Sequence, residues 1–387
     1  MSKKYLLTRF GGIGDLAPVT AVAKVLKDQG HEVHIAARED EHGVRQVDLL
    51  QNTEYCDKAY TFREVGPWKT RCVSFEHGWV DIKSIYPDYD EVIDYMHIVE
   101  YNDTCHSSFV NKPTDEWKKH RNSNWRNWYD LHLEWANIDP TSISDEMKRP
   151  IFALSDEEKE VVADIRGEYD NVVVLNPHAS SLARTWYQAD DLIPLIQEKY
   201  PNSVIFSWKP SKGHWERFSP EGVSEYRSPI KSSLRASMCV VGAADIYVGA
   251  DTGFTHVAES LGIPHIAIYS SVPWWTRAKY YKHQIAIDHG YPTFALTLGD
   301  PNRVEEGMDN LSDKEKKLIE LHERQVPIEE AAKELNTTPE GVSMELQAVK
   351  MKIESFERIQ SKALSKVTIS EVFDKLNGVL EKKEVLA

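Results

Sequence analysis

Hydrophobic and polar positions alternate along the first third of the chain in a pattern typical of a strand followed by a helix. An apolar run over 5–10 stops at Gly11-Gly12-Ile13-Gly14, and apolar residues then recur at helical spacing from Leu16 to Leu26. This predicts a strand, a glycine turn and a helix, with further strands at 33–37 and 89–95. Alternating strands and helices build parallel sheets, so residues 1–145 are expected to form a Rossmann-like domain.

A second alternating series follows a polar stretch between 139 and 158 that contains Pro140 and Pro150. The series predicts strands at 171–176, 203–208, 245–249 and 265–269, with helices at 189–199, 232–240 and 255–261. It defines a second Rossmann-like domain over 155–300. The expected fold class is therefore α/β, with two doubly wound domains facing across a cleft and ligands held at the carboxyl ends of the strands.

The chain becomes charged and helical over 301–360. Ser312 with Glu315 forms a capping-box pattern, Pro327 suits a first helical position, and Thr338-Pro339 opens a third helix. These signals predict a helical, helix-turn-helix-like insert. Residues 361–387 are expected to form a helix that packs back on the body.

Charge and composition narrow the function. The 387 residues carry a formal net charge of −15, which counts against a simple nucleic-acid binder. The chain shows neither an apolar run long enough to span a bilayer nor a leader peptide, so we expect a cytoplasmic protein without integral membrane association. The four cysteines are widely spaced without a CxxC pair, which suggests neither a disulfide framework nor a zinc site, and nothing in the sequence indicates an oligomeric state.

The first candidate motif is the turn Gly12-Ile13-Gly14-Asp15. With Ala17 it fits a weak dinucleotide fingerprint, which would make the chain an NAD-dependent oxidoreductase. However, the Asp15 carboxylate would repel a pyrophosphate at a helix start, and it suits a general base facing a neutral hydroxyl better. The structural alternative is that Asp15 only caps the helix.

The second candidate motif is another strand-to-helix turn, which contains Asp251, Thr252 and Gly253 and is followed by His256. Backbone N–H groups at such a helix start can bind a diphosphate and stabilise its charge as it departs. The alternative is an ordinary capped turn between a strand and a helix.

The third candidate motif follows the strand at 171–176. Ser180 and Ser181 could donate hydrogen bonds to phosphate oxygens, and Arg184 could pair with them bidentately. Lys209, after the next strand, is a further candidate for phosphate contact. The alternative is a loop of common composition.

In their order and spacing, these three motifs resemble glycosyltransferase family 9, the ADP-heptose:lipopolysaccharide heptosyltransferases, over roughly residues 3–290. The resemblance implies a GT-B fold and inverting transfer from a nucleotide-diphosphate sugar, without a metal or other cofactor. It also implies a lipopolysaccharide-core-type saccharide as acceptor. It places Asp15 on the catalytic base, Arg184 on a basic phosphate-binding residue that is usually lysine, and residues 251–253 on the donor loop. The insert over 301–360 has no counterpart in the family.

Aromatic residues in the first domain are candidates for the acceptor side, where we also place Gly12 and Gly14. Trp125, Trp128 and His132 would share one helical face, and aromatic faces suit either a sugar ring or a flipped base. Core packing is the alternative for most of them.

Two further hypotheses involve DNA. One is a phage-type DNA glycosyltransferase acting on a hydroxymethylated base, with the insert contacting DNA, and the other is a non-catalytic DNA-binding regulator. The recognition helix that either would need carries Glu340 and Glu345 beside Lys350, a poor charge balance for phosphate contact.

Overall fold

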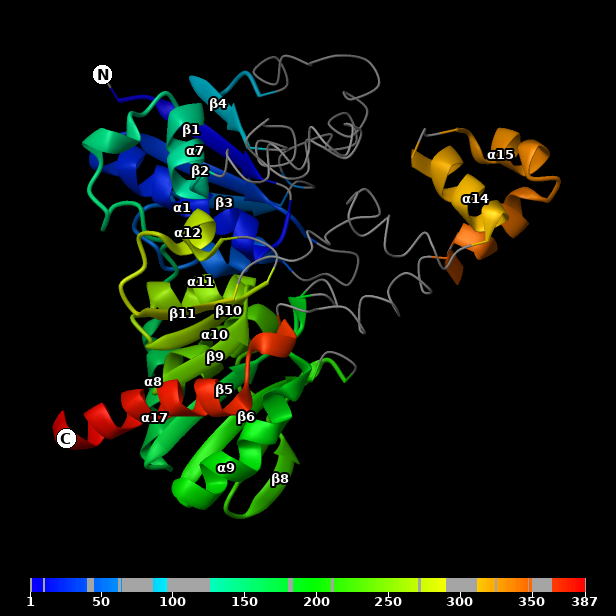
Figure 1. Ribbon diagram of the computed structural model, residues 1–387. Coiled ribbons are helices and arrows are strands. Elements are labelled where there is room, and N and C mark those ends of the chain that lie inside the picture. The colour runs from blue at the N-terminus through cyan, green and yellow to red at the C-terminus, as the bar shows by residue number, and fades with distance from the viewer. Residues whose placement is uncertain are drawn as a thin grey trace.

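The computed structural model describes residues 2–9, 11–39, 45–61, 64, 86–95, 126–179, 184–209, 212–270, 273–289, 312–323, 326–346, 348–349 and 364–386. Two sheets of different size lie one above the other in Figure 1, and helices α11 and α12 lie between them. This arrangement confirms the predicted α/β fold.

The first sheet is small and parallel. Its strand order is β3-β2-β1-β4, with β1 at Lys4–Arg9, β2 at Glu32–Ala37, β3 at Lys58–Thr61 and β4 at Glu91–Asp94. The helices of this domain are α1 at Ile13–Asp28, η1 at Gln46–Leu50 and α7 at Trp128–Trp135. The strands predicted at 5–10, 33–37 and 89–95 are confirmed, whereas β3 was missed because it is short and mostly half-exposed.

The second sheet has seven strands in the order β11-β10-β9-β5-β6-β7-β8. The bounds are β5 Asn171–Asn176, β6 Ser203–Lys209, β7 His214–Ser219, β8 Gly222–Glu225, β9 Ile246–Ala250, β10 His265–Tyr269 and β11 Gln284–Asp288. Strands β7 and β8 pair antiparallel at the edge, and the other pairings are parallel. The four predicted strands are confirmed, and the β7–β8 hairpin was missed.

The helices of the second domain cover both faces of this sheet. They are α8 Asp156–Gly167, η5 Tyr187–Asp191, α9 Leu192–Lys199, α10 Ser233–Ala243, α11 Gly253–Ser260, α12 Trp274–Ala278, η6 Leu364–Lys366 and α17 Ile369–Leu386. The short helix η3 at Pro140–Ser142 instead contacts α7 of the first domain. Alternate residues of β5 enter different cores: Val172 and Val174 join the core containing α10, and Val173 and Leu175 join the core containing α9 and α17. A central strand buried on both faces is what a doubly wound fold requires. Helix α17 packs on the second domain, where the sequence places it.

A buried ion pair holds α8 to α10 beside the first domain. Arg235 Nε donates to Glu158 Oε1 at 2.6 Å, and Arg235 Nη2 also donates to the Ala153 carbonyl at 2.8 Å. Ser232, the N-cap of α10, donates to Asp48 Oδ2 of the first domain at 3.1 Å. The start of α10 therefore links the two domains.

A helical unit over 312–349 has its own small core. It contains α14 at Asp313–Glu323, α15 at Ile328–Glu334 and a third helical stretch over 339–346. Leu318, Leu321, Ala332 and Val342 pack against each other. The unit lies apart from the two sheets in Figure 1. Its role in contacting DNA stays a sequence-based prediction.

Within the described residues, no helix combines the length and the apolar character that crossing a membrane would take.

Candidate functional site

The amino-terminal ends of helices α1 and α11 lie against each other across the domain boundary. A Cβ atom built on Gly253 would lie 2.4 Å from Ile13 Cβ and 3.3 Å from the Gly14 nitrogen, so only glycine fits this contact. Helix α1 begins after Gly12 and α11 begins after Thr252, directly beyond strands β1 and β9. The contact therefore brings the Asp15 motif and the Asp251 motif together at the carboxyl ends of both strands.

Asp15 lies in the first turn of α1 and is held by two donors. Arg9 Nη2 donates to Asp15 Oδ1 at 2.7 Å, and the Gly12 backbone N–H donates to Asp15 Oδ2 at 2.6 Å. Arg9, the last residue of β1, is buried, and its Nη1 also donates to the Tyr95 carbonyl at 2.8 Å. Asp15 thus caps its helix, and a quarter of its side chain remains exposed.

The environment of Asp15 keeps it ionised. Burial raises the pKa of this carboxyl group, but the ion pair and hydrogen bond with Arg9, the charge of Arg277 and the Gly12 N–H together lower the pKa below its ordinary value. Because each carboxylate oxygen can accept more than one hydrogen bond, Asp15 can still accept a hydrogen bond from a hydroxyl.

Two arginines lie beside Asp251. Arg184 Nη1 is 3.4 Å from the Asp251 carbonyl oxygen and 3.6 Å from Asp251 Oδ2, and Arg277 Nε is 3.9 Å from the same Oδ2. The structure therefore brings the predicted residues Arg184 and Asp251 together. It adds Arg9 and Arg277, which the sequence analysis missed. A cation ending the apolar strand before the glycine turn was a readable signal for Arg9, whereas no motif points to Arg277.

His256 lies on α11 and faces Gly14. A Cβ atom on Gly14 would lie 3.2 Å from His256 Nε2, a buried atom without a hydrogen-bond partner among the described residues. His256 Nδ1 bonds to the Tyr281 hydroxyl, which also bonds to the Tyr129 hydroxyl at 2.6 Å. Burial lowers the pKa of His256 to about 4, so the ring is neutral near pH 7.

The two predicted acceptor-side aromatic residues that the structure describes, Trp128 and His132, are buried. Trp128 is 4% exposed, and the Arg277 guanidinium lies 3.5 Å from the centroid of its ring. His132 is fully buried, stacks on Tyr95 with a ring separation of 4.9 Å, and bonds through Nδ1 to the Trp128 carbonyl. The structure favours packing roles for Trp128 and His132 over acceptor contact. Trp125 lies outside the described residues.

The other predicted donor residues differ in their surroundings. Thr252 is the N-cap of α11 in a capping box with Thr255, as the alternative reading of this turn requires. Lys209 ends β6 and forms an ion pair with Asp190, with Nζ–Oδ2 at 2.6 Å. Ser180 and Ser181 lie outside the described residues. The phosphate roles of these residues stay predictions.

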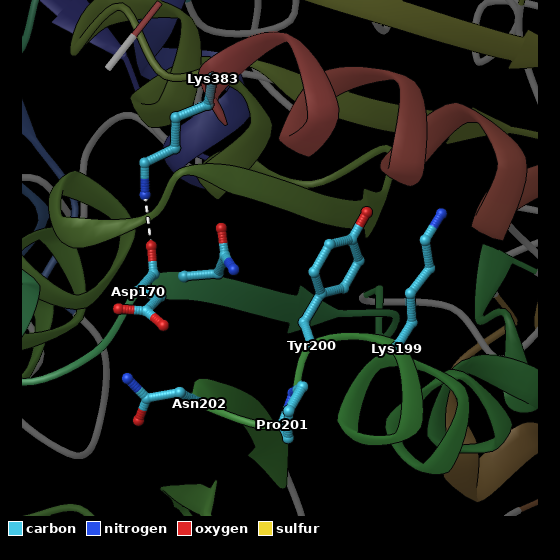
Figure 2. Close-up of a pocket in the computed structure, with 7 residues that line it drawn as sticks. Asp170, Lys199, Tyr200, Pro201, Asn202 and Lys383 are labelled. Carbon is cyan, nitrogen blue, oxygen red and sulfur yellow. Dashed lines mark hydrogen bonds between the residues drawn. The ribbon is translucent and has the colours of Figure 1, made fainter. Parts of the chain in front are cut away.

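A pocket of about 370 Å³ lies elsewhere, at the amino ends of β5 and β6 (Figure 2). Lys383 donates to the Asp170 carbonyl at 2.6 Å and to Asp245 at 2.8 Å, and Lys199 pairs with Glu381 at 2.7 Å. Ligands of doubly wound sheets bind at the carboxyl ends of strands. This pocket is therefore separate from the cluster around Asp15.

The buried His132 predicts a pH dependence of stability. Burial and the nearby Arg9 charge lower the pKa of His132 to about 3, from 6.5 for an ordinary histidine. Below pH 6.5 the unfolded chain binds a proton that the folded chain excludes, so stability falls as pH decreases toward the folded pKa. The expected slope from this residue is about 1.4 kcal/mol per pH unit. Between pH 7.0 and pH 5.0, urea unfolding should therefore show a smaller decrease in the free energy of unfolding for His132→Phe than for the wild type. Equal decreases in the two proteins would contradict this assignment of the buried His132.

The two Rossmann-like domains present a carboxylate, arginines and a helix start to one another, which is the arrangement of a GT-B fold. Residues 139–291 match the family model of glycosyltransferase family 9 (heptosyltransferase), which confirms the resemblance predicted from the sequence. The same match counts against the oxidoreductase hypothesis.

A comparison with solved structures supports this fold through one of its matches. ADP-heptose lps heptosyltransferase II from E. coli is 15% identical, with a TM-score of 0.50, and the match covers 79% of this chain and 98% of that chain. A family 9 glycosyltransferase from Veillonella parvula is 14% identical over 86% of this chain and 97% of that chain, with a TM-score of 0.48. E. coli heptosyltransferase WaaC with ADP-2-deoxy-2-fluoro heptose is 13% identical over 79% of this chain and 99% of that chain, with a TM-score of 0.41. No curated protein matches the sequence.

Proposed function

We propose that the chain transfers a sugar from a nucleotide diphosphate to an acceptor hydroxyl, with inversion and without a metal, and that Asp15 is the base. The observation that carries the proposal is the contact between the starts of α1 and α11, which sets Asp15 of one domain beside the Arg184–Asp251 group of the other.

The proposed reaction needs one base and one site for a leaving anion. The acceptor oxygen attacks the anomeric carbon while Asp15 takes its proton, and the bond from that carbon to the diphosphate oxygen breaks. The departing diphosphate carries the bonding electron pair. Its negative charge is stabilised by Arg184 and by the backbone N–H groups at the start of α11.

For the acceptor, we propose a saccharide of the lipopolysaccharide-core type. The family model, whose description is heptosyltransferase, supports it. The DNA alternative gains no support from the helical unit. Lys314 pairs there with Glu345 at 2.6 Å, and Lys317 pairs with Glu334 at 3.1 Å, so carboxylates already neutralise these two cations.

A thermal-shift screen tests the donor class. The full chain is heated with ADP-, UDP-, GDP-, CDP- and dTDP-sugars, and at least one is expected to raise the melting temperature. A ligand present at 100 times its Kd stabilises the native state by about 2.7 kcal/mol. Arg184→Met should abolish most of the shift, because a phosphate contact is lost. If no nucleotide sugar stabilises the wild type, the proposal is wrong.

A further inference from the structure

Arg277 is a cation in the cluster that no motif or predicted role accounts for. It lies on α12 of the second domain and is 8% exposed. Its Nε is buried without a hydrogen-bond partner among the described residues, and the nearby Asp251 Oδ2 lies at 3.9 Å, beyond hydrogen-bond distance. A buried guanidinium in this state retains capacity to bind an anion.

A residue of the first domain fixes the position of Arg277. The guanidinium lies over the face of Trp128 on α7, with Cζ 3.5 Å from the ring centroid. Asn127, the N-cap of α7, donates through Nδ2 to the Trp275 carbonyl at 2.8 Å and so ties α7 to α12. Stacking restricts the side chain and leaves its edge free to donate hydrogen bonds.

The charges of the cluster favour an anion. Within the part of the chain that the structure describes, the guanidinium groups of Arg9, Arg184 and Arg277 form ion pairs with the carboxylates of Asp15 and Asp251. Asp15 pairs closely with Arg9, at 2.7 Å, whereas Asp251 lies 3.6 and 3.9 Å from the other two guanidinium groups. Among these five side chains there is one more positive than negative charge, and the dipole at the start of α11 adds to the positive potential there.

The direction of Arg277 indicates which part of a donor it meets. Its Nη1 is 4.0 Å from the Cβ position of Gly14, the residue before Asp15, and its charge acts on Asp15. A side chain beside the proposed base Asp15 lies close to the anomeric carbon of the donor sugar. The phosphate closest to that carbon is the one bonded to the sugar.

We propose that Arg277 binds the sugar-linked β-phosphate of the donor and that Trp128 positions Arg277 for this contact. The inference rests on the proposed function and extends it, because a residue of the first domain then controls phosphate binding in the second. Arg277 is a binding residue, and Trp128 is a positioning residue.

Calorimetric binding of nucleoside diphosphates and monophosphates, as ADP/AMP, UDP/UMP and GDP/GMP pairs, tests the inference. Arg277→Gln is expected to raise the Kd of the bound diphosphate about ten- to a hundredfold and to change the Kd of its monophosphate less than threefold, since the monophosphate lacks the β-phosphate. Trp128→Leu should weaken diphosphate binding in the same selective way. Trp128→Phe, which keeps an aromatic face, should restore most of it.

The outcomes separate the two proposals. If Arg277→Gln binds the diphosphate as tightly as the wild type, or loses both nucleotides equally, the inference is wrong and the proposed function stands. If the wild type binds no nucleoside diphosphate, both are wrong. Near-ultraviolet circular dichroism of each variant checks the fold, and Arg277→Lys, which keeps the charge, provides a second variant that should retain part of the diphosphate preference.

Discussion

Replacing Asp15 with asparagine is expected to lower kcat for sugar transfer about 10³-fold while the Kd of the donor changes less than fivefold. A general base contributes about 10² to 10⁴ in rate, and an amide cannot accept the hydroxyl proton. The donor is expected to contact the second domain mainly, so its affinity depends little on this carboxylate. Initial rates at saturating donor, together with calorimetric donor binding, measure both quantities.

A matched variant separates catalysis from structure, because Asp15 also caps α1 and pairs with Arg9. Asp57 has a comparable pair of partners in the same domain, Lys27 at 2.8 Å and the Val33 N–H at 2.7 Å, and no described contact of Asp57 involves the Asp15 cluster. Asp57→Asn should therefore cost stability without a comparable loss of kcat. Normal turnover by Asp15→Asn would refute the assignment of the base.

Much of the fold was predictable because it depends on local patterns. Strand β5 is apolar at each position from Val172 to Leu175, and the structure buries all of them, as a central parallel strand requires. The β7–β8 hairpin was missed for the opposite reason. Strand β8 is exposed along its whole length at the sheet edge, so no core imposes a readable alternation on it.

The candidate site was predictable where chemistry follows a strand directly. Asp15 comes just after a parallel strand of the first sheet and Asp251 just after one of the second, and the doubly wound topology directs each residue to the carboxyl edge of its own sheet. Arg184 followed from its loop composition. The family resemblance, and not the local pattern, joined these three side chains into one site, because they lie in two different domains.

The rest of the site depends on contacts between domains, which a single sequence does not encode locally. Trp128 is of a residue type that can stack on a sugar ring, but the guanidinium of Arg277, 149 positions later in the sequence, covers its ring. Similarly, His256 reaches Tyr129 of the first domain through Tyr281. Trp128, which the sequence suggests as part of an acceptor site, therefore lies in a buried domain interface.

Because the starts of α1 and α11 pack tightly at the domain interface, a second substitution, at Gly253, is expected to have a large effect on activity. Replacing Gly253 with alanine is expected to lower kcat/KM at least about 100-fold. The backbone at Gly253 is not in the left-handed region, so alanine suits it locally, but the new Cβ would lie 2.4 Å from Ile13 Cβ. The starts of α1 and α11 must then separate, and a displacement of about 1 Å at reacting groups costs about 10² in rate. Such overpacking also costs about 1–3 kcal/mol of stability.

Steady-state kinetics and urea unfolding of four proteins distinguish this mechanism from a general loss of fold. Gly378→Ala provides the matched control: it lies inside α17 with no atom within 4 Å of its Cβ position, so alanine should stabilise the helix by about 0.5–1 kcal/mol and leave kcat/KM unchanged. Adding Ile13→Gly to Gly253→Ala removes the clashing atom and should recover part of the lost activity. Without such recovery, or with full activity in Gly253→Ala alone, the direct contact of the two helix starts would not be what brings Asp15 to the donor.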